Sequence, residues 1–227
     1  MIDAYSHKVG VNKGHSQRPV MRLSAADYFE LLINDEDDLQ VRFLDLLAIE
    51  PRLKEDFQFP RLGLKFNHKQ AHLHIGGANA KEPMRYRADL AESFLCNFGG
   101  KQTVLLVRPE EAKYTYEPPF SFESLATVDY SKRGLTNNPV ISKLNAYRAE
   151  LSHGDVLYIP SQYRYAVHYS TISFGLVLSA PPKSMGLKLK AQCNKLVLRP
   201  VDNLAQRVLG KTWQRRKVRK AVRRSKR

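Results

Sequence analysis

The chain has 227 residues, of which 43% are hydrophobic and 26% are charged, enough for one sizeable domain with its own core. Its two cysteines, Cys96 and Cys193, have no metal-binding spacing and are too few for a disulfide framework. No apolar run approaches transmembrane length, and residues 1–12 lack the apolar stretch of a signal peptide. These features exclude disulfide-stapled and zinc-finger classes, and they predict a soluble, cytoplasmic protein.

The net charge of +15 is concentrated at one end of the chain. Residues 211–227 contain ten basic residues and no acidic one. The basic residues are Lys211, Arg215, Arg216, Lys217, Arg219, Lys220, Arg223, Arg224, Lys226 and Arg227. Such a stretch repels itself unless a polyanion neutralises it, so we expect weak contact with nucleic acid or an acidic membrane. The alternative is a solvated tail that only aids solubility.

The first predicted helix begins near residue 24. Ser24 and Asp27 have the spacing of a capping box, and Tyr28, Phe29, Leu31 and Leu32 follow on one apolar side. Together with a second apolar segment, this pattern predicts a helical lead-in over residues 1–70.

The first strand of interest is predicted at residues 72–77, where His72 and His74 alternate with Leu73 and Ile75. Because strand side chains alternate between faces, the two histidines share one side. Two histidines at this spacing could ligate a metal ion, although the spacing specifies no third ligand. We favour the alternative that both are hydrogen-bonded polar side chains.

Arg85 and Arg87 obey the same alternation and should also share a face. Two cations at about 6 Å repel by roughly 3 kcal/mol at an effective dielectric of about 20. They therefore need an anion between them. The sequence leaves two sources open: a nearby carboxylate (Glu82, Asp89 or Glu92), or a bound dicarboxylate or phosphate held by the guanidinium groups.

Further apolar runs at residues 94–98, 103–107, 156–159 and 172–178 predict strands. Near the end of the chain, apolar residues follow helical spacing and Gly210 marks a stop. They are Val201, Leu204, Ala205, Val208 and Leu209. Trp213, Val218 and Val222 indicate a second, shorter helix whose other faces are basic.

Two of these segments together resemble a known family. Glu82-Pro83-Met84-Arg85-Tyr86-Arg87 leads to Gly99-Gly100-Lys101, and Gly154-Asp155-Val156-Leu157-Tyr158-Ile159-Pro160 leads to Tyr165. In order and spacing they resemble the halves of a JmjC-type, cupin-like hydroxylase of the asparaginyl-hydroxylase kind. The resemblance implies a mostly β, double-stranded β-helix (cupin or jelly-roll) with flanking helices. It places the barrel at residues 71–182 and C-terminal helices with a basic tail at 183–227.

The same resemblance implies where Fe(II) and 2-oxoglutarate would bind. Arg85, Arg87 and Tyr165 stand at the places of the family's metal-binding His, Asp and His, and Lys101 matches its co-substrate lysine. Arginine has no lone pair for a metal, and a neutral phenol is a poor ligand. Glu82, at the place of a threonine, would oppose a dicarboxylate. We therefore expect no metal and no cofactor.

The sequence thus predicts a pseudoenzyme, a non-catalytic barrel that binds a small anion or a partner. Its predicted ligand-binding residues are Arg85, Arg87 and Lys101, with Tyr165 or His74 as a hydrogen-bond partner. One alternative is a hydroxylase with a relocated metal site at His72 and His74. The other is a polyanion binder that works through residues 211–227. Because family members often dimerise through C-terminal helices, a homodimer is a further expectation. The alternative is that the apolar stripe of these helices packs back on the chain's own barrel.

Overall fold

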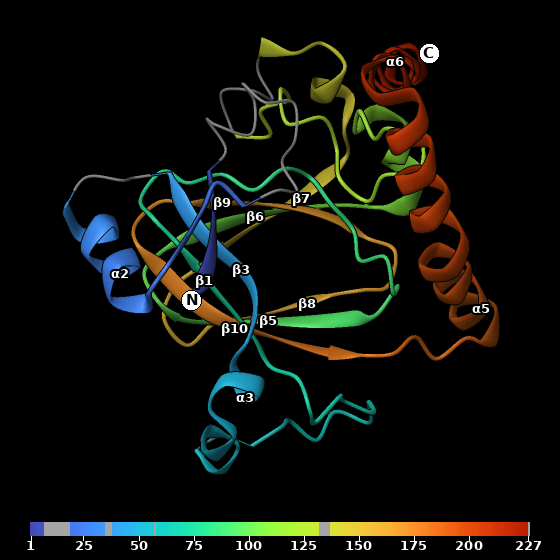
Figure 1. Ribbon diagram of the computed structural model, residues 1–227. Coiled ribbons are helices and arrows are strands. Elements are labelled where there is room, and N and C mark those ends of the chain that lie inside the picture. Colours follow the sequence, from blue (N-terminus) through green and yellow to red (C-terminus); the bar gives the residue numbers. More distant parts are fainter. Residues whose placement is uncertain (7–18, 35–37, 57, 132–136, 227) are drawn as a thin grey trace.

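The computed structural model describes residues 1–6, 19–34, 38–56, 58–131 and 137–226. Two antiparallel sheets lie face to face, and two C-terminal helices stand along one side of them (Figure 1). No helix in these described ranges combines the length and the apolarity that crossing a membrane requires.

The larger sheet has seven strands in the order β2-β1-β3-β4-β10-β5-β8. The strands span Met21–Leu23 (β2), Ile2–Ser6 (β1), Leu39–Asp45 (β3), His72–Gly76 (β4), Ser173–Ala180 (β10), Glu92–Gly99 (β5) and Val156–Ile159 (β8). The closing strand predicted near residue 172 is thus β10, and it pairs with both β4 and β5 in the centre of the sheet.

The smaller sheet has the order β7-β6-β9, with strands Ala146–Leu151 (β7), Gln102–Val107 (β6) and Arg164–Tyr169 (β9). The segment from Lys81 to Arg85 runs antiparallel along the free edge of β9 and forms bridges at both its ends. This segment therefore sits where a fourth strand of the small sheet would sit, and it carries Arg85 to a place beside Tyr165.

Each face of the large sheet has its own core, as strand alternation requires. On the face toward the small sheet, apolar side chains from both sheets form one cluster: Ala80, Leu95, Val104, Leu106, Leu151, Ile159, Tyr165, Val167 and Tyr169. On the outer face, Phe66, Phe94, Leu176 and Leu178 pack together. One end of the space between the sheets is thus filled by an apolar core. A buried cluster of charged side chains lies next to it.

The N-terminal lead-in contains more strand than the sequence pattern indicated. The capping box at Ser24 and Asp27 does open a helix, α2 (Ala25–Asn34), and Tyr28 and Leu32 are buried. Short helices follow at Leu46–Ile49 (α3) and Pro51–Glu55 (η1). Strands β1, β2 and β3, however, extend the large sheet beyond β4. The apolar residues of β3 were ambiguous because a short buried strand and a helix segment share that pattern.

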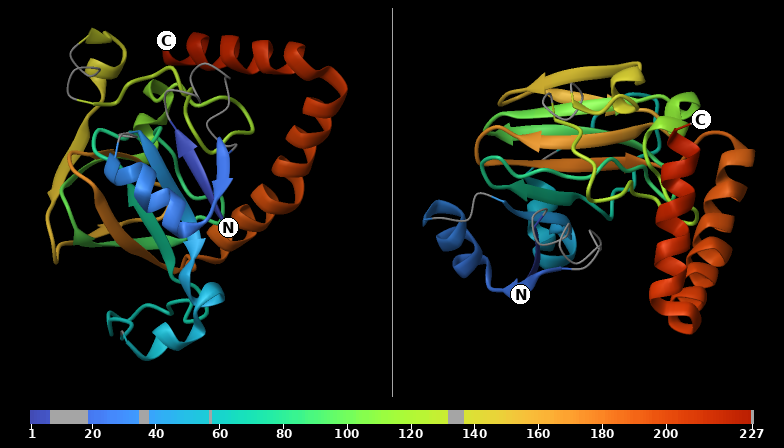
Figure 2. Two further views of the ribbon diagram at one scale, coloured as in Figure 1. Left: turned by 60° about the vertical axis from the view of Figure 1, so that its left-hand side comes forward. Right: turned by 90° about the horizontal axis from the view of Figure 1, so that it is seen from above.

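The segment between β6 and β7 contains helices at Pro109–Tyr114 (η2) and Ile141–Lys143 (η3). After β10, helices span Met185–Cys193 (α5), Asn194–Leu198 (η4) and Arg199–Ser225 (α6). Gly210, with φ of 48° and ψ of −124°, breaks α6 into two helices, as predicted. Figure 2 shows the two halves meeting at an angle, with the second half returning toward the sheets.

Asp202 holds this bend closed. Its carboxylate accepts hydrogen bonds from Trp213 Nε1 and Lys217 Nζ, both at 2.8 Å. These contacts join the first half of α6 to the second. We infer that the basic segment has a fixed orientation rather than that of a free tail.

Candidate functional site

Arg85 lies at the centre of a buried polar cluster between β4 and β9. Its backbone exchanges hydrogen bonds with that of Tyr165, at 2.9 and 2.8 Å, which puts both side chains on the same face. Arg85 Nε donates to Tyr165 Oη at 3.2 Å, and the guanidinium group also lies over the Tyr165 ring. Arg85 and Tyr165, which stand at two of the positions expected for metal ligands, are therefore in direct contact.

Glu82 forms an ion pair with Arg85, and both side chains are almost fully buried. Burial alone would favour the neutral acid, but Arg85 and Arg42 outweigh it and hold the pKa of Glu82 below its ordinary value. Burial would likewise lower the pKa of Arg85, but Glu82 outweighs that effect and the pKa is raised. Both groups stay charged at neutral pH, and each compensates the other.

The cluster continues from Glu82 to His74. Tyr169 Oη donates to Glu82 Oε1 at 2.6 Å, and His74 Nδ1 lies 3.2 Å from the same hydroxyl. Because that hydroxyl already donates to Glu82, Nδ1 of His74 must be the donor in this contact. Burial lowers the pKa of His74 to about 4, with Glu82 opposing and Arg85 assisting. His74 is thus neutral at pH 7.

A second layer from β3 lies above Arg85. The Phe43 ring stacks on the guanidinium group at 4.6 Å and meets His72 edge-on at 6.1 Å. Phe43 has a positive φ of 56°, where the register of β3 against β4 shifts. Beside it, Arg42 stacks on Tyr5 and faces Glu123 at 3.8 Å. This layer covers the cluster with an aromatic ring and a second Arg–Glu pair.

Arg87 has a carboxylate partner of its own. Its Nε and Nη2 atoms lie 2.9 and 2.6 Å from the two oxygens of Asp89, a bidentate arrangement. Burial would lower the pKa of Arg87, but Asp89 outweighs it and the pKa is raised. Arg87 and Asp89 also influence His72, whose pKa burial lowers. Arg87 therefore belongs to the same neighbourhood as Arg85 but to a separate ion pair.

Lys101 is placed differently from the two arginines. It follows Gly100 in the tight turn between β5 and β6, and its side chain is exposed. On β6, Leu106 pairs with Tyr165 of β9, whereas Lys101 lies just before Gln102, at the opposite end of the strand. The structure thus brings together Arg85, Tyr165 and His74, places Arg87 next to them, and puts Lys101 at the far turn.

Three members of the cluster were not predicted: Tyr169, Arg42 and Phe43. Tyr169 is four residues after Tyr165 on one strand, so strand alternation could have placed both on one face. Arg42 and Phe43 come from the lead-in, and the bulge that turns Phe43 over Arg85 has no sequence signal. Nowhere in the described ranges do three His, Cys, Asp or Glu side chains converge as a metal site would require.

The second half of α6 presents a different kind of charged surface. Its buried side consists of Lys217, Ala221 and Ser225, spaced four residues apart, and Ser225 Oγ accepts a hydrogen bond from Tyr116 N at 3.1 Å. The remaining basic residues are exposed: Lys211, Arg215, Arg216, Arg219, Lys220, Arg223, Arg224 and Lys226. Within the described ranges, Lys217 is the one cation of this half that forms an ion pair, with Asp202.

The model of the cupin-like domain family matches residues 13–180. The Jumonji C domain-containing protein 5 of Drosophila melanogaster is 26% identical over 138 residues, which cover 58% of this chain and 34% of the relative. The tRNA wybutosine-synthesizing protein 5 of Homo sapiens is 25% identical over 151 residues, or 63% and 46%. That of Gallus gallus is 26% identical over 143 residues. The chain thus spans about a third to just under half of these relatives' lengths.

Proposed function

The chain belongs to the cupin-like domain family, and from this premise we propose that it is a member without iron-dependent chemistry. In this proposal the buried pair of Arg85 and Glu82 replaces the metal centre, and the two sheets close into a double-stranded β-helix. The observation that carries the proposal is the Arg85 guanidinium group, ion-paired with Glu82 and hydrogen-bonded to Tyr165. The Lys81–Arg85 segment along β9 supports the closure.

The donor set at the family's metal positions does not fit Fe(II). That ion is held by two imidazoles and one carboxylate in such oxygenases, with open positions for the reactants. Arg85 and Arg87 offer only N–H donors, and each already has a carboxylate partner. A metal ion bound here would also have to overcome their two positive charges. We therefore derive no chemical step that passes through iron.

The relocated site at His72 and His74 has less support than the ion pair. His74 is oriented through Tyr169 toward Glu82, whose carboxylate already faces Arg85. Phe43 packs against His72 from the other side. Metal binding at these two histidines would require Glu82 to leave its buried arginine, and that would cost several kcal/mol.

The small anion predicted from the sequence also has internal competitors. Glu82 and Asp89 are the carboxylates that Arg85 and Arg87 need, and Lys101 lies at the far turn. We propose that the charged groups between the sheets satisfy one another, so that their role is to hold the fold. An external anion would first have to displace a carboxylate that is covalently part of the site.

The iron proposal is tested by loading the purified protein anaerobically with Fe(II) and measuring bound iron by elemental analysis. Decarboxylation of 2-oxoglutarate is followed in the same samples. We expect no stoichiometric iron and no turnover. The control is a variant with Arg85→His, Arg87→Asp, Tyr165→His and Glu82→Thr, which restores the family's ligands. One tightly held iron in the unaltered protein, with turnover, would contradict the proposal.

A second function is favoured by α6: we propose that its basic half binds nucleic acid. The helix packs on the body through Lys217, Ala221 and Ser225, which leaves eight exposed cations on its other faces. Residues 211–225 form a helix about 21 Å long at 1.5 Å per residue. Phosphates of one DNA strand recur about every 3.4 Å along the axis, so the helix can face about six of them.

The same geometry argues against a membrane surface. An interfacial helix needs a free apolar face opposite its charged face. Here Ala221 is buried and Val222 half-buried against the body, and Val218 is the exposed apolar side chain of this half. The names of the human and chicken relatives mention tRNA, which makes RNA a natural candidate for this chain as well.

Binding is measured with duplex DNA and with anionic phospholipid vesicles, at low and physiological salt. About six phosphate contacts predict a log–log salt slope of roughly −5 for DNA. Removal of residues 211–227 should abolish DNA binding, and the vesicles should bind weakly throughout. Unchanged DNA affinity after the truncation would contradict the proposal, and preferential vesicle binding would favour the membrane alternative.

A further inference from the structure

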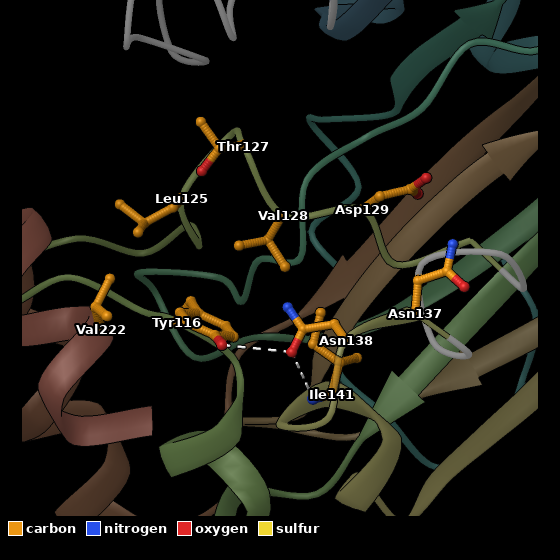
Figure 3. A pocket seen from close by; sticks show the side chains of 9 residues that line it. All are labelled: Tyr116, Leu125, Thr127, Val128, Asp129, Asn137, Asn138, Ile141 and Val222. Carbon is orange, nitrogen blue, oxygen red and sulfur yellow. Dashed lines mark hydrogen bonds between the residues drawn. The ribbon is translucent and has the colours of Figure 1, made fainter. Parts of the chain in front are cut away.

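A cavity of about 440 Å³ lies directly beside the end of the basic helix (Figure 3). It is lined by Tyr116, Leu125, Thr127, Val128, Asp129, Asn137, Asn138, Ile141 and Val222. Its volume falls within the range of small-molecule sites in proteins. Because it lies outside the space between the sheets, the ion pairs described above do not account for it.

The cavity has an apolar floor and a polar rim. Tyr116, Val128 and Ile141 are buried, and Leu125 and Val222 are half-buried. Thr127 and Asn137 are exposed, and Asp129 and Asn138 are half-buried. Such a site suits a ligand that has a flat apolar body and polar groups at its edge. A nucleobase has this character.

Asn138 is fixed with one end free for a ligand. Its Oδ1 accepts hydrogen bonds from Val140 N at 3.0 Å, Ile141 N at 3.3 Å and Tyr116 Oη at 3.4 Å. Because the backbone N–H groups can only donate, the accepting atom must be the oxygen. In Figure 3 the amide nitrogen of Asn138 lies on the side toward Val128. It is therefore a pre-oriented donor at the cavity. On the same rim, Asp129 accepts from Ser131 N at 2.8 Å and from Lys81 Nζ at 3.1 Å, and its carboxylate oxygens have further lone pairs for a donor on a ligand.

The basic helix supplies phosphate contacts next to this cavity. Val222 belongs both to this helix and to the lining of the cavity. Ser225 Oγ accepts a hydrogen bond from the backbone N–H of Tyr116, which is part of the cavity wall. Residues three and four apart share a helix face, so Arg219 and Lys226 lie on the face of Val222. A strand whose phosphates contact these two cations therefore has a base within reach of the cavity.

A second cavity, of about 340 Å³, shares Val128 and Asp129 with the first. It lies over the outer face of the small sheet, where Lys81, Arg148 and His168 line it. Lys81 is paired with Asp129 at 3.1 Å and Arg148 with Glu150 at 3.0 Å. This neighbouring cavity therefore does not extend the row of unpaired cations on the basic helix.

We propose that the cavity beside Val222 takes an unpaired base of a single-stranded nucleic acid whose backbone lies on α6. This inference rests on the proposed nucleic-acid function and adds its substrate class: strands with unstacked, accessible bases can fill the cavity, whereas an intact duplex contacts only the cations of the helix. Asn138 donates to the base edge, Asp129 accepts from it, and Tyr116 and Val128 contact its faces.

The test compares a short single-stranded RNA with an abasic strand of the same length, which keeps every phosphate and lacks the bases. We expect the full-length protein to bind the base-containing strand about ten-fold more tightly, as one stacked base provides. Asn138→Asp keeps the oxygen that accepts from the backbone but replaces the donor with a carboxylate oxygen facing the base edge, so it should clearly reduce this ten-fold difference. Asn203→Asp, on the first half of α6, makes the same charge change away from the cavity and should preserve it.

Each other outcome has a distinct meaning. Equal binding of the two strands overturns the base site while leaving phosphate binding intact. A ten-fold difference that survives in Asn138→Asp places the base elsewhere and also overturns the inference. Binding of neither strand overturns the proposed nucleic-acid function itself, together with the inference that rests on it.

Discussion

The space between the sheets and the second half of α6 are both rich in arginine. The charges are paired with carboxylates in the first region and mostly unpaired in the second. Between the sheets, Arg85 and Arg87 each face a carboxylate, and the cluster is closed by Tyr165, Tyr169 and His74. Over residues 211–226, eight cations point to solvent, and one further cation, Lys217, is paired. Charges that are matched within the fold stabilise it, whereas unmatched charges on a rigid surface are available to a partner.

The largest effect should come from breaking the buried pair. Glu82→Gln keeps the shape of the side chain but leaves the Arg85 charge buried without its partner. We expect the free energy of unfolding to fall by about 3–5 kcal/mol, the range measured when one member of a buried ion pair is removed. Urea denaturation followed by circular dichroism measures this loss.

Two matched variants sharpen that measurement. Asp89→Asn breaks the more exposed pair and should cost under about 1 kcal/mol. The double variant Glu82→Leu, Arg85→Met removes both charges, and it should be clearly more stable than Glu82→Gln because no charge is left uncompensated. A double variant no more stable than the single one would show that the pair is not the source of the effect.

The next effect is a dependence of stability on pH through His74. The pKa of His74 is about 4 in the folded protein, lowered by burial, against 6.5 ordinarily. Between these values the unfolded chain binds a proton that the folded chain does not. The free energy of unfolding should therefore have its full value above about pH 6.5. It should fall by about 3 kcal/mol as the pH drops toward 4.

Urea denaturation of the unaltered protein and of His74→Gln across this pH range measures the dependence. His74→Gln should flatten the curve between pH 4 and 6.5. An identical curve for His74→Gln would mean that other groups cause the acid sensitivity.

A smaller effect is expected from neutralising cations on α6. Arg219→Gln with Arg223→Gln removes two phosphate contacts, so the salt slope should become shallower by about 2 and the affinity near physiological salt should fall about thirty-fold. Fluorescence anisotropy with labelled duplex measures both quantities. Lys183→Gln with Lys188→Gln makes the same charge change before and within α5, and a comparable loss there would point to net charge rather than to this helix.

The smallest effect concerns self-association through the C-terminal helices, which remains a prediction. Leu189, Leu204 and Val208 are 63–72% exposed on α5 and the first half of α6, and a second copy would cover them. We expect Leu204→Lys to weaken a homodimer by about ten-fold, as seen by light scattering across a concentration series. Leu62→Lys, at another exposed leucine, is the control, and equal behaviour of both variants would exclude this surface.

The sequence predicted best the elements whose signals are local, and it missed the strands of the N-terminal lead-in. The histidine strand, the capping box at Ser24 and the stop at Gly210 each depend on neighbouring residues, and all three were confirmed. The side of Arg85 followed from alternation, and Glu82 was named among the carboxylates that could pair with it. The pairing of Arg85 with Glu82 depends on a distance, which alternation does not give, and binding of an external anion stays a prediction.

The residues that the sequence missed depend on contacts between distant segments. Phe43 reaches Arg85 only because β3 joins the large sheet and bulges there, at a positive φ that no pattern predicts. Lys101 was grouped with the arginines by its place in a motif, but the length of β6 separates it from Tyr165. The cavity beside Val222 arises where α6 returns to the segment before β7, a tertiary contact without a local signal.

The central claim is that the charges between the sheets satisfy one another, and chemical rescue tests it most directly. Glu82→Ala removes the carboxylate and leaves a space beside Arg85 that formate can fill. Thermal unfolding is measured with and without formate, alongside chloride at equal ionic strength. We predict that formate restores much of the lost stability of Glu82→Ala and leaves the unaltered protein unchanged. Stabilisation of the unaltered protein by formate or a dicarboxylate, without rescue of Glu82→Ala, would contradict the account.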